Sequence, residues 1–270
     1  MSLRAFVSTS RVEMTFDGKV HARKLFRSEI VRAADDLVLE NYMADRVPLY
    51  YRAPEDIAKD LDRGYFTQAI ADTLGRLPKA KEFRDSHFGE LLAAEFAVAA
   101  MGLRLLYTKV RLLTAENANA YKMDVVMYDP EPDEIELVLL EVKASIKQPS
   151  KTKAARHDKS IYSSLFSSLN KYGKEDLRYD LTAARDRLTE VAQEDRHRVE
   201  LALSKYGGPT VRYAGVCSID IGTYVQDEAA MLATRKNEKT LDVDLVCVAE
   251  FAQVIEKTFT RLERIRTAAC

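Results

Sequence analysis

One segment near the middle of the chain limits its possible folds more than any other. Residues 137–140, Leu-Val-Leu-Leu, are apolar on both sides of an extended chain, which is typical of a central strand covered on its two faces. Glu141 and Lys143 follow directly. Because residues two apart on a strand point to the same face, the sequence predicts a carboxylate and an ammonium group side by side at the end of a buried strand. Burying such charges is expensive unless they are paired or bind a metal ion.

The segments around this strand predict an α/β fold with a central mixed sheet flanked by helices. Short β-branched runs separated by turn-forming residues indicate strands, and an Ala- and Leu-rich run starting at Ser86 and closing at Gly102 indicates a helix. We expect Ser86 to cap that helix. The helical stretch after residue 160 should break near 172–173. The expected order is helix, three strands, helical stretch, two strands and helix, at residues 86–101, 103–113, 122–129, 135–145, 160–204, 210–220, 242–251 and 252–265.

The first 80 residues predict a small α+β region that precedes this core. We expect two short strands in residues 1–20, one amphipathic helix over 22–44 that ends at Val47-Pro48, and two short helices in 54–77 separated by Gly64. Proline and mixed charge in the stretch that follows mark a boundary. We therefore divide the chain into an N-terminal region, 1–80, and a domain, 81–270. The N-terminal region holds no obvious chemistry, which makes it the natural place for partner contact.

Two further carboxylates are expected beside Glu141. Asp124 precedes the apolar residues of the preceding strand, and a turn-forming stretch, DPEPDE, would join the two strands as a hairpin, so that Asp124 converges on Glu141. Glu90, near the start of the helix before the hairpin, can approach the same cluster. Each residue has a plainer alternative. Glu-x-Lys is common on solvated strands, Lys143 can simply pair with Glu141, and the helix dipole favours Glu90 at a helix start without any ligand.

These residue types suit metal-assisted phosphodiester hydrolysis. Mg²⁺ takes oxygen ligands, usually one or two carboxylates together with waters and substrate phosphate. A bound metal lowers the pKa of water and offsets transition-state charge, and a nearby lysine can orient or activate the attacking water. The sequence therefore favours an enzyme that depends on Mg²⁺, with Mn²⁺ as the alternative ion.

The order Glu90, Met123-Asp124, Glu141-Val142-Lys143 resembles the PD-(D/E)xK nuclease superfamily over residues 86–220, with Met123 where that family has proline. The resemblance implies a restriction-endonuclease-like core. It implies catalytic roles for Glu90, Asp124, Glu141 and Lys143, and it makes Asp124, Glu141, Val142 and Glu90 the metal site.

The chain is also similar, more closely, to the HamA family, the nuclease subunits of the bacterial Hachiman anti-phage defence system. The similarity lies in HFGELLAAEF, KMDVVMYD and LLEVKAS, together with an N-terminal region of matching size. It implies a DNA substrate and a helicase partner. No GxxxxGK[ST] loop is present, so any ATP would be used by another subunit. Two alternatives stay open: a stand-alone restriction or repair endonuclease, and a nuclease-like binding subunit without catalysis, against which the intact Asp, Glu and Lys argue.

A run of basic residues follows the Glu-x-Lys motif. Residues 143–159 hold six lysines and arginines against one acid, although the whole chain has a formal net charge of −1 and no global positive field. A solvated surface and a phosphate-contacting loop explain this run equally well. If the loop contacts DNA, the contact residues are Lys147, Lys151, Lys153 and Arg156.

The cysteines and the apolar segments set the expected environment. Cys217, Cys247 and Cys270 lack CxxC spacing, so they predict neither a disulfide framework nor a zinc site but buried thiols. The chain shows no signal-peptide pattern and no apolar run long enough to cross a membrane. We therefore expect a cytoplasmic protein without a membrane partner.

Overall fold

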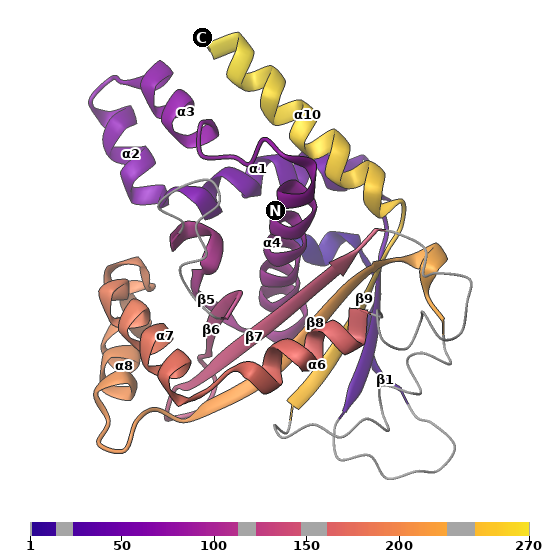
Figure 1. Cartoon of the computed structure of the whole chain (residues 1–270). Helices are drawn as coiled ribbons and strands as arrows, with labels where there is room; N and C mark the ends of the chain where they lie inside the picture. The colour runs from indigo at the N-terminus through magenta and orange to yellow at the C-terminus, as the bar shows by residue number, and fades with distance from the viewer. Residues whose placement is uncertain (1, 15–23, 113–122, 147–160, 226–240, 270) are drawn as a thin grey trace.

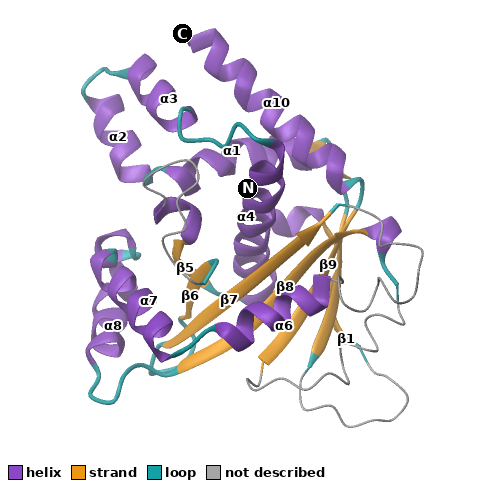
Figure 2. Ribbon diagram, in the orientation of Figure 1, coloured by secondary structure: helices purple, strands orange, loops and turns teal. Residues whose placement is uncertain are grey.

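The computed structural model describes residues 2–14, 24–112, 123–146, 161–225 and 241–269. Its centre is a mixed seven-stranded sheet in the order β1-β2-β9-β8-β7-β6-β5, seen in Figures 1 and 2. The strands β2, β9, β8 and β7 run parallel, whereas β1 and the β5-β6-β7 meander pair antiparallel. The strands are β1 Val7–Glu13, β2 Leu25–Ile30, β5 Arg104–Thr108, β6 Val125–Asp129, β7 Glu136–Ser145, β8 Val211–Asp220 and β9 Leu241–Val248.

Helices cover both faces of the sheet, and this confirms the predicted α/β class. The helix α4 packs on one face of β7, and α6 crosses the other face (Figure 1). The helices are α1 Leu39–Tyr51, α2 Pro54–Asp62, α3 Phe66–Leu74, α4 Lys81–Met101, α6 Ile161–Lys171, α7 Lys174–Asp186, α8 Gln193–Ser204 and α10 Phe251–Ala269. Short elements complete the described residues: strands β3 Ala33–Ala34 and β4 Leu37–Val38, and 3-10 helices Leu3–Phe6, Lys109–Leu112, Leu188–Glu190 and Ile221–Thr223.

The strand β7 is buried on both faces, as its apolar run predicts. Val138, Leu140 and Val142 join the core beneath α4, while Leu137 and Leu139 join the core beneath α6. The same alternation sends Glu141 and Lys143 to the α6 side of the sheet. The charged end of β7 therefore lies between two apolar layers.

Several other expectations are confirmed. The helix α4 closes at Gly102, whose φ of 71° is the left-handed conformation that glycine tolerates best. Gly64 separates α2 from α3, and β6, β7 and β8 lie where their sequences predict. The strands β5 and β9 are also present but end earlier than predicted, at Thr108 and Val248. The helical stretch after residue 160 does break near 172–173, but it breaks again before Gln193, which gives three helices instead of two.

The single amphipathic helix expected over residues 22–44 is wrong. Leu25–Ile30 form β2, between β1 and β9, and a helix begins only at Leu39. Leu25 belongs to the core under α6 and Ile30 to the core under α4, as an odd separation on a strand requires. Over so short a run, the spacing of apolar residues fits a helix and a strand equally well. Hydrogen bonding to the two neighbouring strands, β1 and β9, makes this segment a strand. Of the two strands expected in residues 1–20, the described residues contain one, β1. Residues 15–20 lie outside the described part of the chain.

Two predicted helix ends are also wrong. The helix α1 continues through Pro48 to Tyr51, so the proline stands in its last turn. The helix α4 begins at Lys81 rather than at Ser86, and its N-cap, Ala80, has no side-chain hydrogen bond. Arg84 instead donates to the carbonyl oxygen of Pro78 at 2.9 Å, which holds the first turn in place.

The N-terminal residues continue the central sheet. The strand β2 pairs with β9 from Leu25↔Val243 to Ile30↔Val248. The helix α1 is tied to α4 through the buried carboxylate of Glu95, which accepts hydrogen bonds from Tyr42, from Tyr50 at 2.7 Å and from Arg46 at 2.8 Å. A domain boundary at residues 77–85 stays a prediction.

Two simpler expectations concern cysteines and membranes. Cys217 and Cys247 are free and buried, which confirms the prediction for these two thiols, and Cys270 lies outside the described residues. Within the described ranges, every helix is too short or too polar to traverse a lipid bilayer.

The helix α4 approaches β7 most closely at Gly89. A Cβ atom added to Gly89 would lie 2.3 Å from the Cβ of Ala144. Only a residue without a side chain allows this approach. The contact brings the next residue on the helix, Glu90, to the charged end of β7.

We therefore expect Gly89→Ala to destabilise the protein by about 1–3 kcal/mol, because helix and strand must separate to admit the methyl group. Urea unfolding measures this change. The double variant Gly89→Ala/Ala144→Gly removes the clash and should recover most of the loss. A single variant as stable as the wild type would contradict the close packing of α4 on β7.

Candidate active site

A cavity of about 390 Å³ lies at the carboxyl end of β7. It is lined by α4, by the chain that follows β5, by the residue that precedes β6, and by the last residues of β7. Its charged lining includes Glu90, Lys109, Asp124 and Lys143. The structure therefore brings three of the four predicted catalytic residues to one cavity, and the fourth, Glu141, is paired with Lys143 beside it.

The hairpin between β6 and β7 places Asp124. Val125 pairs with Leu140 in antiparallel register, so the residue before Val125, Asp124, comes opposite Glu141. One carboxylate oxygen of Asp124 accepts a hydrogen bond from the backbone N–H of Val142 at 2.9 Å, and its carbonyl oxygen accepts from the N–H of Lys109 at 2.9 Å. These bonds fix Asp124 between β5 and β7, the strands on either side of β6, while its second carboxylate oxygen lies 3.6 Å from Lys109 Nζ at the cavity.

Glu141 and Lys143 form a short ion pair. Lys143 Nζ lies 2.5 Å from Glu141 Oε1, and Ser168 of α6 donates a further hydrogen bond to this carboxylate. Burial and the negative charge of Asp124 raise the pKa of Glu141 to about 7, although Lys143 opposes the shift. Burial alone would lower the pKa of Lys143, but the charges of Asp124 and Glu141 outweigh it and raise that pKa. Lys143 therefore stays protonated at neutral pH.

Glu90 is buried in the third turn of α4. Its Oε2 atom has no hydrogen-bond partner among the described residues, and burial together with Asp124 raises its pKa well above the usual value. Because α4 begins at Lys81, Glu90 does not stand in the first turn, where the helix dipole would favour it. The helix dipole therefore does not explain why Glu90 stands here. Glu90 is a buried carboxylate that lines a cavity and has one oxygen without a hydrogen-bond partner among the described residues.

Lys109 is a site residue that the sequence reasoning missed. Its Nζ atom lies 3.6 Å from Asp124 Oδ1, and its charge lowers the pKa of Glu90 against the larger effect of burial. The sequence prediction placed Lys109 inside a strand, but β5 ends at Thr108. The sequence does hold a signal for Lys109. This lysine directly follows an apolar strand, and the next strand begins directly after Asp124, so antiparallel pairing of the two strands brings the two residues together.

Two other side chains that can carry chemistry, His87 and Cys217, do not line this cavity. His87, one turn before Glu90, shares a hydrogen bond of 2.8 Å with the hydroxyl of Tyr51, and burial and the charge of Lys109 lower its pKa to about 4. It is neutral at pH 7 and does not line the cavity. Burial raises the pKa of Cys217 to about 12, so this thiol is no nucleophile.

The donor set at the cavity suits a hard cation. The carboxylates of Glu90, Asp124 and Glu141 act on one another electrostatically, and Glu90 offers an oxygen without a partner. In the described part of the chain, no three Asp, Glu, His or Cys side chains form a closed metal-binding group as they stand. Instead, two of the carboxylates are paired with lysines: Lys143 contacts Glu141, and Lys109 approaches Asp124.

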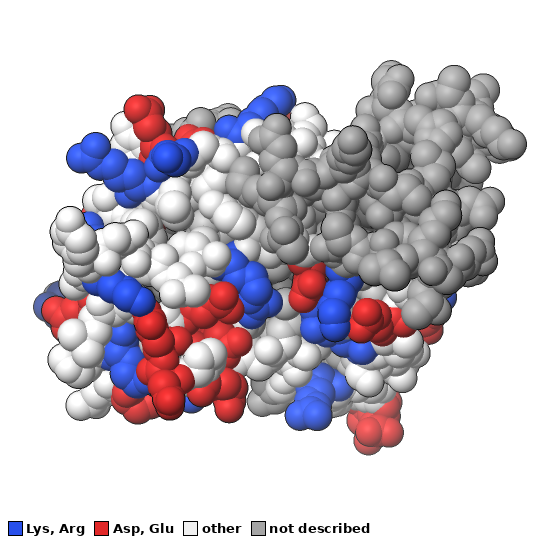
Figure 3. Space-filling view, turned by 90° about the horizontal axis from the view of Figure 1, so that it is seen from below, with Lys and Arg blue, Asp and Glu red and all other residues white. Residues whose placement is uncertain are grey.

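The predicted DNA-contact residues Lys147, Lys151, Lys153 and Arg156 lie outside the described residues. Figure 3 shows one face of the molecule, on which the basic and acidic side chains of the described residues are interspersed. The described part of this face therefore presents no broad area of positive charge.

Comparison with known proteins gives one family. The family model HamA matches residues 7–261, which include every described residue of the cavity. No curated protein matches the chain.

The raised pKa of Glu141 predicts how stability depends on pH. Between pH 4.5 and about 7, the folded protein holds a proton on Glu141 that the unfolded chain releases. Stability from this group therefore falls as pH rises through that window. Glutamine cannot ionise, so Glu141→Gln should not lose this stability at high pH. We expect the free energy of unfolding of the variant, relative to that of the wild type, to be higher at pH 8 than at pH 5 by up to about 3 kcal/mol.

Urea unfolding at both pH values, with EDTA present, measures this gain. The matched control is Glu136→Gln at the start of the same strand, where the side chain is partly exposed and pairs with Arg212 at 2.9 Å. An equal effect of Glu141→Gln at both pH values would count against the crowding of Glu141 by Asp124.

Proposed function

The chain belongs to the HamA family of Hachiman defence-associated proteins, and on that premise we propose that it is a metal-dependent deoxyribonuclease of the PD-(D/E)xK type. The observation that carries the proposal is the meeting of Glu90, Asp124 and Lys143 at one cavity, with Glu141 paired beside them. They come from α4, from the start of β6 and from β7. The order of these elements along the chain supports the superfamily assignment.

A divalent cation, Mg²⁺ or Mn²⁺, fits the residues that are present. Asp124, Glu141, Val142 and Glu90 are the proposed ligands, with oxygen donors of the kind these ions prefer. When bound, the ion would polarise the scissile phosphate and lower the pKa of the attacking water. The unpaired oxygen of Glu90 and the mutual repulsion of the carboxylates both favour binding of positive charge.

Lys143 and Lys109 are the proposed hydrogen-bond donors to the attacking water and the phosphate. Since Lys143 stays protonated, it serves as a hydrogen-bond donor that orients the attacking water or stabilises negative charge on the phosphate, and not as a general base. Lys109 approaches the cavity from the opposite side of Asp124 and supplies a second donor for phosphate oxygens. DNA binding would draw both ammonium groups toward the substrate and leave Asp124 and Glu141 for the cation.

The cellular role proposed for this activity is antiviral, with a helicase as the partner. Family membership supports a place in the Hachiman system. The helicase would supply ATP-driven work on DNA. The N-terminal region is the proposed contact surface for this partner.

Replacement of the motif residues should abolish cleavage without loss of the fold. We expect Glu141→Ala and Lys143→Ala each to reduce plasmid degradation in Mg²⁺ by about 100-fold or more, because each removes a group that acts on the transition state. Both variants should stay folded. Glu141→Ala should melt close to the wild type because Lys143 keeps the charge of Asp124, whereas Lys143→Ala should melt at a lower temperature because it leaves the buried Glu141 without its partner.

The ion pair of Glu134 and Lys205, on the surface away from the cavity, provides matched controls. Glu134→Ala and Lys205→Ala should cleave like the wild type. Full cleavage by a folded Glu141→Ala or Lys143→Ala variant would overturn the proposed active site, as would cleavage that persists in EDTA.

Metal binding should also be visible without activity. We expect Mg²⁺ or Mn²⁺ to raise the melting temperature of the wild type, because an ion that binds only the native state stabilises it by mass action. Asp124→Asn should abolish the increase. Asp129→Asn, at the other end of β6, should keep it. A response that survives in Asp124→Asn would place the metal elsewhere.

A further inference from the structure

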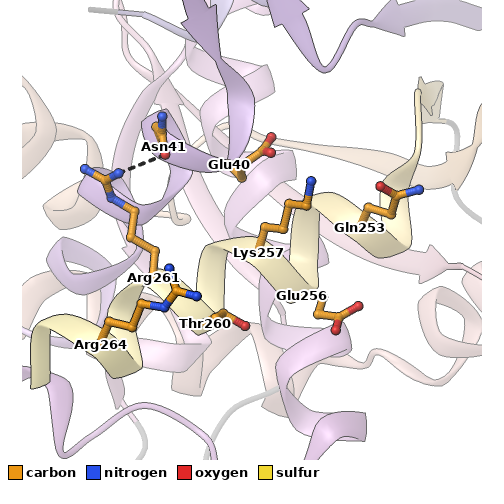
Figure 4. Close-up of a pocket in the computed structure, with 8 residues that line it drawn as sticks. All are labelled: Glu40, Asn41, Gln253, Glu256, Lys257, Thr260, Arg261 and Arg264. Atoms are coloured by element: carbon orange, nitrogen blue, oxygen red, sulfur yellow. Dashed lines mark hydrogen bonds between the residues drawn. The ribbon is translucent and has the colours of Figure 1, made fainter. Parts of the chain in front are cut away.

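A second hollow lies on the outer side of α10, where this helix meets the start of α1 (Figure 4). Its volume is about 610 Å³, larger than that of the cavity at β7, and the two share no lining residue. Glu40 and Asn41 come from α1, and the other lining residues come from α10. In Figure 4, the side chains of Lys257, Arg261 and Arg264 extend along this side of α10.

Positive charge is concentrated along this hollow. Lys257, Arg261 and Arg264 are exposed and stand four and three residues apart, so they occupy neighbouring turns of one helix face. Like charges at these spacings repel each other and weaken a helix. Two acids line the same hollow: Glu40, which Arg32 engages at 2.6 Å and on which the charge of Lys257 also acts, and the exposed Glu256. With Glu40 paired to Arg32, the three cations leave a net positive charge along the hollow.

Neutral polar groups complete the hollow. Asn41 accepts a hydrogen bond from Arg261 at 3.0 Å, drawn as a dashed line in Figure 4, which holds this guanidinium group at the rim. Asn41, Gln253 and Thr260 offer both donors and acceptors of the kind that pair with peptide groups. Among the described residues that line the hollow, none has an aromatic side chain on which a nucleic-acid base could stack.

The chemistry and spacing of the hollow favour an acidic polypeptide over a polyphosphate. Glu40 and Glu256 interrupt the positive charge of the hollow, so an occupant must place its acidic groups at separate positions beside the cations and not present an unbroken line of charge. Lys257 and Arg261 are separated by roughly 6 Å along the helix axis. Alternate side chains of an extended peptide repeat at roughly 6.6 Å, so two acidic residues of a strand can meet these two cations.

We propose that the hollow between α1 and α10 binds an extended acidic segment of a partner polypeptide. The basic face of α10 pairs with the acidic side chains, and Asn41 and Gln253 hydrogen-bond to the peptide groups of that segment. This site is independent of the cavity at β7 and of its proposed nuclease activity.

Fluorescence anisotropy with a labelled, end-capped hexaglutamate peptide tests the proposal on the full chain. We expect the wild type to bind this peptide and Lys257→Gln/Arg264→Gln to bind it about tenfold more weakly, the size expected for the loss of two exposed charge pairs. The matched control is Lys174→Gln/Arg178→Gln, which removes two exposed positive charges from α7 and should bind like the wild type. Glu256→Gln should tighten binding, because it removes a negative charge from the hollow.

The competing occupant is nucleic acid, and a labelled oligothymidylate of equal charge distinguishes it. The proposal is overturned if the wild type does not bind hexaglutamate, or if both double variants lose binding equally. It is also overturned if Lys257→Gln/Arg264→Gln impairs oligothymidylate binding more than hexaglutamate binding. Binding of hexaglutamate that depends on Lys257 and Arg264 but not on Lys174 and Arg178 supports it.

Discussion

Electrostatic repulsion among Glu90, Asp124 and Glu141 is the constraint around which this protein is built. All three carboxylates are buried, each is held by a different element, and they act on one another across the end of β7. Such an arrangement costs folding free energy, which the apolar layers on both faces of the sheet must offset. Lys109 and Lys143 reduce the repulsion without removing it, since Glu90 keeps an unpaired oxygen. The unfavourable electrostatic energy is therefore localised at this cavity, where bound positive charge would lower it.

The sequence predicted the sheet and its charged edge well, because their signals are local. The apolar run that ends in Glu141 and Lys143, and the short hairpin back to Asp124, depend on residues close together in the chain. The prediction of a helix over residues 22–44 failed because β2 exists through its pairing with β9, more than 200 residues later. The contribution of Lys109 was missed because it depends on where β5 ends, and strand ends are set by tertiary pairing.

The site is supported by contacts that no motif describes. Tyr42, Tyr50 and Arg46 of α1 converge on Glu95 of α4, and Tyr51 reaches His87 on the same helix. Glu90 lies between these two anchoring points, so the N-terminal helix fixes the part of α4 that carries it. Gly89 then lets α4 come close enough to β7 for this carboxylate to face the others. The N-terminal region and the candidate active site are thus connected by direct packing of α1 on α4.

The pairing of β2 with β9 has a consequence for biosynthesis. The strand β2, with β1 paired to it, joins the rest of the sheet through β9, which lies more than 200 residues later and directly before α10. Contacts so distant in sequence form late and slowly, because the loop between them must first be closed. While the ribosome is still making the chain, β1 and β2 have no parallel neighbour, and α10 is missing from the face that it covers. Synthesis of β9 and α10 is therefore a precondition for the finished sheet, and a product that stops before them would lack the support that holds α4 and the carboxylates in place.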